Sequence, residues 1–512
     1  MLIGIPREPQ TLVAATPDTV GKLIKLGYDV EVQSGAGDRA DHPDSQYEAA
    51  GATVVGDDVW STADIITTLD TPDAAQLAAM KPQAMLVSRL APGRNDDLVA
   101  DLAARNITAL AMDTVPRISR AQAMDVLSSQ ANVGGYRAVI EAANAFGRLF
   151  TGQVTAAGKV PPATVYVIGT GVAGLAAIGT ASSMGAIVKA TDLRPETAEQ
   201  VESMGAEFVA IPTAAEKSDD GYAKEMTDDQ ATAAAKLYAE QSAAADIVIT
   251  TANIPGRTSP VLLTAADVAA MKPGSVIVDM AAANGGNCEL TVAGEVTTTD
   301  NGVTIIGYTD LAGRLPAQSS QLYGQNVVNL FKLLTPAKDG TPVLDFDDEI
   351  VRGITVTHAT ASGTDILWPP PPVKVSAAPA PAAAPAQDAA ASAPEEEKSS
   401  SGLWWKIVAG VLGVALVLAS PLSVTTNYMI LMLAVVVGFY VITAVTHSLH
   451  TPLMSETNAI SGIILVGAVL QVGSSNVAIA VLAFIAIVIA SINIFGGFAV
   501  TRRMLAMFQG GN

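Results

Sequence analysis

Short apolar runs alternate with longer amphipathic stretches along the N-terminal part of the chain. The apolar runs are bounded by polar or turn-forming residues, which is typical of strands buried in a sheet. They fall at Leu2–Ile5, Asp29–Val32, Ile65–Thr68, Met85–Val87 and Thr108–Met112. The stretches between them have helical character. Strands that alternate with helices in this way predict a parallel sheet with crossover helices.

The same alternation returns after a long helix predicted at about Arg120–Phe150. The second set of strands is predicted at Val165–Ile168, Ile187–Thr191, Ile247–Thr250, Val276–Asp279 and Thr304–Ile306. We therefore predict an α/β fold with two Rossmann-like, doubly wound domains, the first from residues 1–135 plus 317–368 and the second from residues 136–316. Ligands of paired domains usually bind in a cleft at the carboxyl ends of the strands.

The pattern changes twice beyond Trp368. Residues 369–402 are rich in Pro, Ala and Ser without apolar periodicity, and they predict a disordered linker. Residues 403–512 are strongly apolar and predict an all-α membrane domain of four transmembrane helices, each close to the roughly 20 residues that span a bilayer. These helices are expected near Trp404–Ser420, Tyr428–Val445, Leu453–Val472 and Val477–Val500.

Basic residues predict how this domain is oriented. Lys406, Arg502 and Arg503 flank its two ends, and the loops between the predicted helices carry no Lys or Arg. The positive-inside rule then places the N-terminal domain and the C-terminus in the cytoplasm. Arg7 and Glu8 interrupt any early apolar region, so we expect no signal peptide.

Composition narrows the classes of function. A chain of 512 residues is too long for one core. The net charge of −20 argues against nucleic-acid binding and against a basic membrane-binding face. The single cysteine, Cys288, excludes internal disulfides and suits a reducing compartment. Metal-ligand spacings, nucleophile elbows and Walker-type lysine motifs are absent from the sequence, so no metal is expected.

The strongest chemical motif follows the predicted strand Val165–Ile168. It is a GxGxxG turn that opens an Ala-rich helix, with the expected cofactor contacts Gly169, Gly171, Val172, Ala173 and Gly174. Such a turn holds a dinucleotide pyrophosphate at a helix N-terminus. Asp192, about twenty residues on, suits a ribose and favours NAD, whereas Arg194 keeps NADP possible. A glycine-rich turn without a ligand is the alternative.

Several segments together resemble the alpha subunit of proton-translocating NAD(P) transhydrogenase of the bacterial type. They are Met112–Gln122, Gly169–Gly174, Gly307–Leu311, Arg314–Pro316, His450–Met454 and Asn458–Gly462. The resemblance runs from end to end. It implies NAD(H) on this chain, hydride exchange with NADP(H) on a beta subunit, and coupling to proton translocation across the bacterial inner membrane. It also implies a hetero-oligomer, in which we expect this chain to dimerise through its soluble part.

The resemblance also implies roles for individual residues. Arg117, Gln122, Asp125 and Ser128 match the polar set that positions the nicotinamide and its ribose. Asp192 matches the acid that binds the adenosine ribose, and Tyr222 lies in the segment Lys217–Asp229 that matches a loop closing over bound nucleotide. Thr251, Ala252 and Gly205 complete the expected cofactor contacts.

The residues alone leave some of these roles open. Gln122, Asp125 and Ser128 recur every three residues and would share a helical face. By spacing alone a solvated helix face is the favoured explanation, and only the resemblance favours a binding role. Tyr222 has a plain surface position as its alternative. Gly285–Cys288 fits a turn or a cofactor contact, and Asp310 and Arg314 fit a hinge or the cleft.

Two other functions compete with the first. The runner-up is a membrane-anchored alanine-dehydrogenase-like oxidoreductase, although Leu12 stands where those relatives carry an arginine, in a segment that looks shortened. His42 and His358 have no convincing partner for acid–base work, and direct hydride exchange needs none. A non-catalytic NAD sensor is the second alternative.

The membrane part offers few groups for a proton path. They are His447, His450, Glu456, Asn458, Gln471, Ser491 and Asn493. Interfacial positions explain such residues as well as a pathway does. We therefore expect the main proton relay on the partner subunit.

Overall fold

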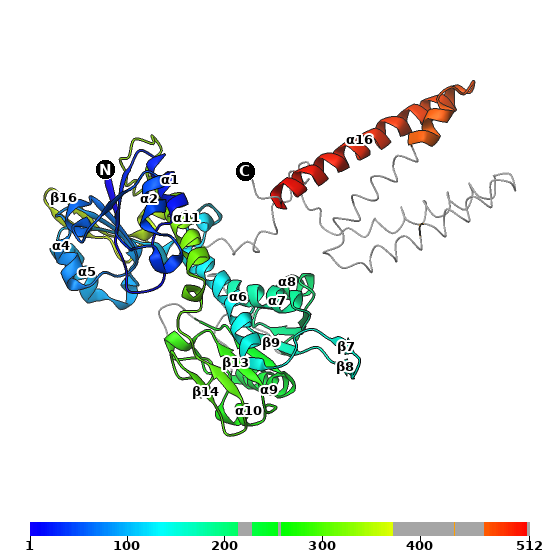
Figure 1. The fold of residues 1–512 in the computed structure, drawn as a ribbon, viewed down its shortest axis with the longest axis horizontal. Helices are drawn as coiled ribbons and strands as arrows, with labels where there is room; N and C mark the ends of the chain where they lie inside the picture. Colours follow the sequence, from blue (N-terminus) through cyan, green and yellow to red (C-terminus); the bar gives the residue numbers. More distant parts are fainter. Residues whose placement is uncertain (213–227, 254–257, 372–434, 436–464, 509–512) are drawn as a thin grey trace. The chain divides into compact units, whose positions relative to one another are not determined.

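The computed structural model describes residues 1–212, 228–253, 258–371, 435 and 465–508, with the backbone alone for residues 228–229 and 493–508. The chain divides into a unit of Met1–Ala386 and a unit of Gln387–Asn512. The first unit contains two large sheets, each with helices packed against it (Figure 1). This confirms the prediction of two Rossmann-like α/β domains.

The first sheet has eight strands in the order β17-β16-β6-β5-β4-β1-β2-β3. Their bounds are β1 Leu2–Ile5, β2 Asp29–Gln33, β3 Thr53–Val55, β4 Ile65–Asp70, β5 Met85–Arg89, β6 Thr108–Ala111, β16 Thr355–Thr360 and β17 Gly363–Ile366. Strands β1 to β6 are parallel, whereas β16 and β17 pair antiparallel. The chain therefore returns to its first sheet near residue 355.

Helices connect and cover these strands. They are α1 Pro17–Ile24, α2 Asp44–Ala49, α3 Val59–Thr62, α4 Ala74–Ala79, α5 Asp96–Ala104, α11 Pro316–Leu334 and α12 Glu349–Ile354. Short 3₁₀ turns are η1 Asp38–Ala40, η2 Pro92–Arg94, η3 Met112–Thr114 and η4 Ser119–Met124. Separate apolar clusters that contain Ile65 and Ile66 pack beside the sheet, and neighbouring residues of a strand point to opposite faces. Both faces of the sheet are therefore buried.

The second sheet has seven strands in the order β11-β10-β9-β12-β13-β15-β14. Their bounds are β9 Thr164–Ile168, β10 Ile187–Thr191, β11 Glu207–Phe208, β12 Ile247–Thr250, β13 Val276–Asp279, β14 Val296–Thr298 and β15 Thr304–Ile306. All pairs are parallel except β14 with β15. The direction of winding reverses between β9 and β12, which makes that point the topological switch of this sheet.

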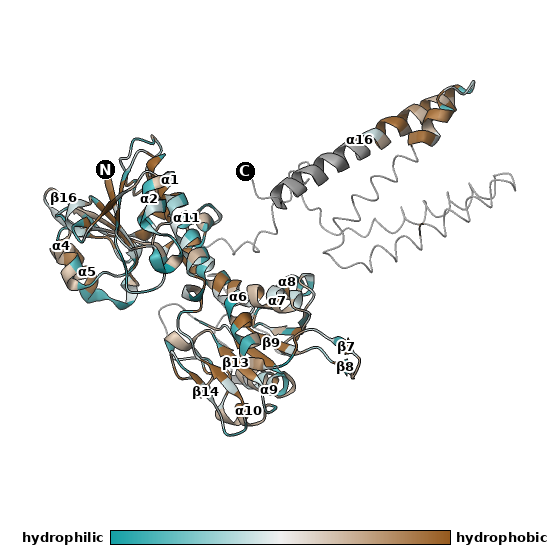
Figure 2. Ribbon diagram, viewed as in Figure 1, coloured by the Kyte–Doolittle hydropathy of each residue, from teal (hydrophilic) through white to brown (hydrophobic). Residues whose placement is uncertain are grey.

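The helices of this half are α7 Val172–Ser183, α8 Ala198–Ser203, α9 Asp228–Ala244 and α10 Ala265–Ala269, with the 3₁₀ turns η5 Pro195–Thr197, η6 Ala282–Asn284 and η7 Ala312–Arg314. Strands β9 and β13 are coloured as hydrophobic in Figure 2, and all four residues of β12 and of β13 are buried. Burial on both faces explains why these strands are continuous apolar runs.

Helix α6, Val126–Phe146, is shorter than the helix predicted at Arg120–Phe150, so that prediction was wrong at both ends. Asp125 has an extended backbone and caps the helix by accepting a hydrogen bond from the Ser128 N–H at 2.9 Å. Gly147 ends it with a φ of 66°. The residues before Asp125 form the separate turn η4. Helix α6 continues across the predicted domain boundary at residues 135 and 136.

A two-stranded hairpin joins the region of α6 to the second sheet. Strands β7 (Gln153–Thr155) and β8 (Gly158–Val160) pair only with each other and extend away from the sheet (Figure 1). All six of their residues are exposed. The alternating pattern of the sequence did not predict this hairpin.

The second unit is described in part. Helix α16, Val477–Phe508, begins where the fourth membrane helix is predicted, and residues 465–471 are also helical. The first predicted membrane helix lies outside the described residues, as do all but one residue of the second and most of the third. No helix in the described ranges is both long and apolar enough to cross a membrane.

A buried carboxyl group lies at the carboxyl edge of the first sheet. Glu8 is 8% exposed and accepts hydrogen bonds from the backbone N–H groups of Leu69 (2.9 Å) and Asp70 (3.2 Å), where β4 ends. The side chain of Gln10 also donates to it at 2.9 Å. Burial, only partly offset by these hydrogen bonds, raises the pKa of Glu8 to about 7.

This shift predicts a stability that falls as the pH rises. Between the unfolded pKa of 4.5 and the folded pKa of about 7, the native state holds a proton that the unfolded state has lost. The free energy of unfolding should therefore decrease by up to about 3 kcal/mol across this range. Glu8→Gln should remove most of that dependence in denaturant titrations of the detergent-solubilised chain.

The matched control is Glu48→Gln, since Glu48 is exposed on α2. It should keep the dependence of the wild type. A Glu8→Gln variant whose stability varies with pH as in the wild type would contradict the assignment.

Candidate functional site

Strand register brings three segments of the chain to one point. Ile168 at the end of β9 lies opposite Thr191 of β10 and Thr250 of β12, so Gly169, Asp192 and Thr251 follow at the same edge. The N–H of Gly169 donates to the carbonyl of Thr191 at 2.8 Å. This edge is the switch point of the second sheet, where ligands of doubly wound folds bind.

The three glycines of the turn meet different surroundings. Gly169 has a φ of 95°, and an added Cβ would lie 2.5 Å from the hydroxyl of Thr251. At Gly174 an added Cβ would lie 1.9 Å from the carbonyl oxygen of Gly169, whereas at Gly171 it would meet nothing within 4 Å. Gly169 thus makes the turn, Gly174 lets α7 pack on it, and Gly171 leaves open space beside the start of α7.

Helix α7 begins at this open space. Gly171 is its N-cap residue, and Val172 and Ala173 form its first turn. The N-terminus of a helix presents backbone N–H groups and a partial positive charge to an anion. A dinucleotide pyrophosphate fits both the charge and the space.

Thr251 and Ala252 form the other wall of the turn. The Thr251 hydroxyl donates to the carbonyl of Gly169 at 3.0 Å, and its N–H donates to the carbonyl of Ile168 at 2.9 Å. The carbonyl of Ala252 accepts from the side chain of Asn287 at 2.8 Å. Both residues therefore lie at the turn, as the expected cofactor contacts require.

Asp192 and Arg194 form an ion pair beside the turn. The carboxylate of Asp192 is 8% exposed and accepts from the N–H of Thr170 at 2.7 Å and from the Arg194 guanidinium at 3.0 and 3.1 Å. Burial raises the pKa of Asp192, but its hydrogen bonds with Arg194 and Thr170 lower the pKa by a larger amount. The net shift of the pKa is therefore downward. The group stays ionised, and a ribose hydroxyl can donate to it by replacing one of these donors.

The backbone conformation of Gly205 accounts for a glycine at this position without a bound ligand. It lies in the turn between α8 and β11 with a φ of 80°, and its N–H donates to the carbonyl of Glu202 at 3.0 Å. An added Cβ would meet nothing within 4 Å. Tyr222 and residues 217–227 of the predicted closing loop lie outside the described residues.

The polar set of the first domain spans two elements. Arg117 is exposed in the segment before η4, Gln122 is exposed on η4, and Asp125 and Ser128 lie at the start of α6. The hydroxyl of Ser128 donates to the Asp125 carboxylate at 2.5 Å. The prediction that Gln122, Asp125 and Ser128 share one α-helical face was therefore wrong.

Distant residues hold this segment in place. The carbonyl of Ala123 accepts from the amides of Asn326 and Asn329 on α11, each at 2.9 Å. Arg120 pairs with Asp348, the N-cap of α12, at 2.6 Å. Sequence reasoning missed these anchors because they lie about 200 residues away.

Helix α6 brings the polar set and the glycine turn together. An added Cβ at Gly135 of α6 would lie 2.1 Å from the carbonyl oxygen of Ala173 in the first turn of α7. Gly135 is buried. The two helices therefore touch backbone to backbone two to three turns after Asp125 and Ser128.

The loop after β13 closes around a buried acid that the sequence did not single out. Asp279 accepts from the N–H groups of Asn287 (2.7 Å) and Cys288 (3.0 Å). Its carboxylate thus holds the Gly285–Cys288 segment as a tight turn. Asn284 at the start of this loop contacts Asn253 at 2.9 Å and Arg94 of the first domain at 3.4 Å.

Asp310 and Arg314 lie just before α11, where the chain returns to the first domain. The Asp310 carboxylate accepts from the N–H of Gly313 at 2.8 Å. The guanidinium of Arg314 pairs with Glu141 on α6 at 3.0 Å and lies 3.4 Å from the centre of the Tyr308 ring. These contacts fasten the returning segment to α6.

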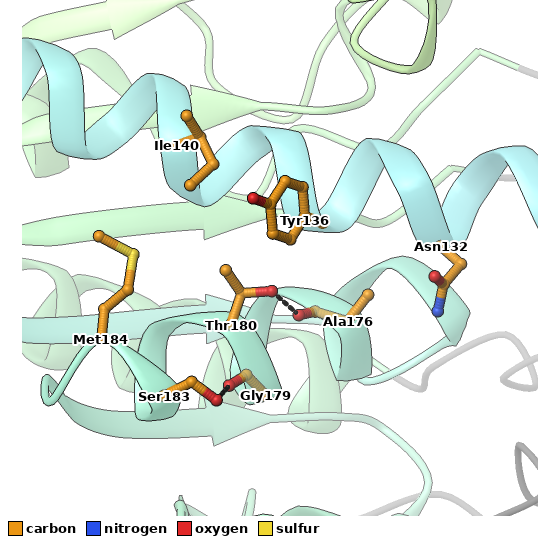
Figure 3. Close-up of a pocket in the computed structure, with 8 residues that line it drawn as sticks. All are labelled: Asn132, Tyr136, Ile140, Ala176, Gly179, Thr180, Ser183 and Met184. Atoms are coloured by element: carbon orange, nitrogen blue, oxygen red, sulfur yellow. Dashed lines mark hydrogen bonds between the residues drawn. The ribbon is translucent and has the colours of Figure 1, made fainter. Parts of the chain in front are cut away.

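A cavity of about 520 Å³, widely open to the surface, lies between α6 and α7 (Figure 3). Tyr136 and Ile140 reach it from α6, and Thr180 and Met184 from the second half of α7 and its end. None of the predicted site residues lines it. It is therefore a separate feature from the dinucleotide site.

Models of known protein families match both α/β domains and part of the apolar C-terminal region. Residues 4–134 match the family model of the alanine dehydrogenase/PNT N-terminal domain, and residues 138–363 match that of the C-terminal domain. Residues 427–510 match the 4TM region of pyridine nucleotide transhydrogenase.

Individual relatives extend the likeness over the whole chain. The NAD(P) transhydrogenase subunit alpha of Haemophilus influenzae is 53% identical over 100% of both chains. That of Cereibacter sphaeroides is 48% identical over 99% of this chain and 100% of its own. The crystal structure of transhydrogenase from Sinorhizobium meliloti is 41% identical and covers 70% of this chain and 99% of its own, with a TM-score of 0.65.

Two alanine substitutions in the turn should affect different properties, one mainly stability and the other mainly dinucleotide binding. Gly174→Ala should lower the free energy of unfolding by about 1–3 kcal/mol, because the new Cβ collides with the backbone of Gly169. Gly171→Ala should lower the free energy of unfolding by at most about 1 kcal/mol, because alanine is a poorer N-cap than glycine. It should weaken dinucleotide binding, because its Cβ fills the space before α7. Thermal unfolding and binding titrations would separate the two.

Each variant is the control of the other. A Gly171→Ala protein that binds dinucleotide as tightly as the wild type would contradict the placement of the pyrophosphate. A Gly174→Ala protein of full stability would contradict the packing described at Gly169.

Proposed function

This chain belongs to the family of NAD(P) transhydrogenase alpha subunits, and we propose that it binds NAD(H) and exchanges hydride with NADP(H) held by a beta subunit. In this proposal the exchange is coupled to proton translocation across the membrane. The main support is the glycine turn, which lies with Asp192 at the switch point of the second sheet. The chain also matches an alpha subunit along its full length.

The described residues support one arrangement of the dinucleotide. Its pyrophosphate lies in the space beside Gly171 at the start of α7, with Val172 and Ala173 presenting backbone N–H groups. Asp192 accepts hydrogen bonds from the adenosine ribose. The nicotinamide then points toward the first domain, where Arg117, Gln122, Asp125 and Ser128 donate and accept hydrogen bonds.

NAD(H) supplies the hydride in this arrangement, so the chain needs to orient the ring rather than transfer a proton. Gln122 is exposed and offers both a donor and an acceptor for a carboxamide. Asp125 and Ser128 are joined by a hydrogen bond of 2.5 Å and are fixed on the first turn of α6. The polar set therefore suits positioning.

The dehydrogenase alternative has less support. Leu12, at the position where the dehydrogenase relatives carry arginine, is 5% exposed and packs in the apolar cluster of the first sheet. A substrate carboxylate would find an apolar core residue there. Alanine-dehydrogenase activity and simple NAD sensing are therefore alternative outcomes of the hydride-transfer assay.

The membrane part completes the proposal. Residues 369–402 act as a linker, and four helices in residues 403–512 cross the inner membrane with the N-terminal domain and C-terminus in the cytoplasm. The match of residues 427–510 to the 4TM region supports this, as does α16, on which Leu482 is 67% and Phe484 61% exposed. Exposed apolar side chains of this size suit a lipid environment.

A second copy of this chain is proposed as a further partner. Four exposed apolar side chains lie on or beside the segments that join α6 to β10, namely Tyr136, Leu149, Val154 and Ile187. Backbone hydrogen bonds connect these segments, since Ala163 donates to Phe150 and Ile187 donates to Ala163. Together with the cavity that Met184 lines next to them, they favour this face as the dimer contact (Figure 3).

The catalytic proposal is tested in membranes that contain this chain with and without a transhydrogenase beta subunit. Hydride transfer from NADH to an NADP analogue should require the beta subunit and should shift with an imposed proton gradient. Oxidation of NADH by pyruvate plus ammonia without the beta subunit would instead indicate the dehydrogenase. Neither activity, with NADH still bound, would favour the sensor.

Substitutions in the polar set should affect transfer more than binding. Gln122→Ala and Asp125→Asn should each reduce hydride transfer about tenfold or more because the ring loses its orientation. AMP, which probes the adenosine end, should bind as in the wild type. Asn retains the helix cap at position 125. Gln46→Ala, at an exposed glutamine of α2, is the control, and unchanged transfer in either variant would remove that residue from the site.

Dimerisation is tested at the hairpin. Val154→Lys places a charge at a side chain that is 79% exposed, and it should convert the detergent-solubilised dimer to a monomer. Light scattering corrected for bound detergent measures the mass of the protein. Val343→Lys, at an exposed valine outside this face, should leave the dimer intact. An unchanged mass for Val154→Lys would place the contact elsewhere.

A further inference from the structure

The carboxylate of Asp192 is enclosed by donors from Thr170 and Arg194. The N–H and hydroxyl of Thr170 lie at 2.7 and 2.9 Å. The N–H, Nε and Nη2 of Arg194 lie at 2.9, 3.0 and 3.1 Å. The hydroxyl of Thr170 has one hydrogen and also lies 2.8 Å from the hydroxyl of Thr197. The four N–H donors alone fill the roughly four acceptor positions of a carboxylate.

Arg194 contributes most of this saturation. Its guanidinium approaches both oxygens, Nε to Oδ1 and Nη2 to Oδ2, in the forked geometry that arginine uses for carboxylates and phosphates. Its hydrogen bond to Asp192 raises the pKa of Arg194, and that of Asp192 is lowered. Both groups are therefore charged at neutral pH, and the fork of Arg194 is engaged inside the protein.

We propose that Arg194 is a latent ligand for the 2′-phosphate of NADP, held by Asp192 so that this site selects NAD. This inference rests on the proposed function. The 2′-position of an adenosine ribose is recognised at this carboxylate in Rossmann-type sites, where a nearby arginine can accept a phosphate instead. Here the arginine lies two residues from the acid and is bound to it.

The pair excludes NADP in two ways. The ionised carboxylate repels a phosphate that approaches the ribose site, and it occupies the guanidinium that would otherwise neutralise that phosphate. A 2′-hydroxyl is itself a donor, so it can replace one hydrogen bond of Arg194 at the carboxylate while the other bonds of the pair stay. Selectivity matters here because both dinucleotides take part in the proposed reaction.

Removing the charge of Asp192 should therefore release Arg194. Asp192→Asn keeps the size of the side chain and an oxygen that can accept from the N–H of Thr170. In the detergent-solubilised full chain, it should weaken NADH binding and strengthen NADPH binding at least about tenfold relative to the wild type. Adenosine 2′,5′-bisphosphate should compete better than AMP only in this variant, and less well as ionic strength increases.

The double variant Asp192→Asn/Arg194→Gln identifies the ligand. It should lose the gain in NADPH binding, whereas Arg194→Gln alone should bind NADH and still exclude NADPH. Equal NADPH affinity in the single Asp192→Asn and the double variant would overturn the role of Arg194. An Asp192→Asn protein that folds but gains no NADPH binding would do the same.

Two measurements keep the outcomes distinct. Thermal unfolding reports whether each variant is folded, and Asp192→Ser, which also removes the charge, replaces Asp192→Asn if that protein does not fold. Failure of the wild type to bind NADH would refute the proposed function as well as this inference. Normal NADH binding by the wild type, with no switch in the variants, would refute the inference alone.

Discussion

Backbone-to-backbone contact at α7 is the constraint on which the rest of the site depends. Gly174 allows the first turn of α7 to touch the carbonyl of Gly169, and Gly135 allows α6 to touch the carbonyl of Ala173. A side chain at either position would separate the elements by the width of a methyl group or more. Because α6 also begins with Asp125 and Ser128, the same contact sets how far the polar set of the first domain lies from the glycine turn.

Acids at the carboxyl edges of both sheets fix the neighbouring backbone. Asp113 accepts from the N–H groups of Leu90 and Ala91 after β5, both at 2.8 Å. Glu8 accepts from the last residues of β4, and Asp192 and Asp279 accept from N–H groups in the loops after β9 and β13. This arrangement satisfies loop backbone groups that would otherwise be buried without a partner. It also makes the edge acidic, so an anionic dinucleotide depends on the dipole at the start of α7 for its phosphates.

The parts of this structure that could be predicted are those encoded by neighbouring residues. The apolar runs predicted the central strands, and the spacing from Gly169 to Asp192 predicted residues that the register does bring to one edge. The start of α6 could not be predicted, because the backbone of residues 119–125 depends on Asn326, Asn329 and Asp348, far along the chain. Residues 317–368 were predicted to belong to the first domain, but the pairing of β16 with β6 was not, since about 240 residues separate these strands. Asp192 and Arg194 are only two positions apart, but the sequence does not reveal whether two such charges bind each other or a ligand.

In the proposed function, three kinds of interaction each bind a different part of the dinucleotide. Charge acts at the adenosine end through Asp192 and Arg194, the helix dipole acts on the pyrophosphate, and hydrogen bonds from the first domain act on the nicotinamide. Only the last of these lies on a different domain from the glycine turn. The affinity for the adenosine half and the orientation of the reacting ring therefore rest on separate elements, which α6 joins at Gly135. This separation suits a transhydrogenase, because the nicotinamide ring must face a second dinucleotide on another subunit while the adenosine half remains bound.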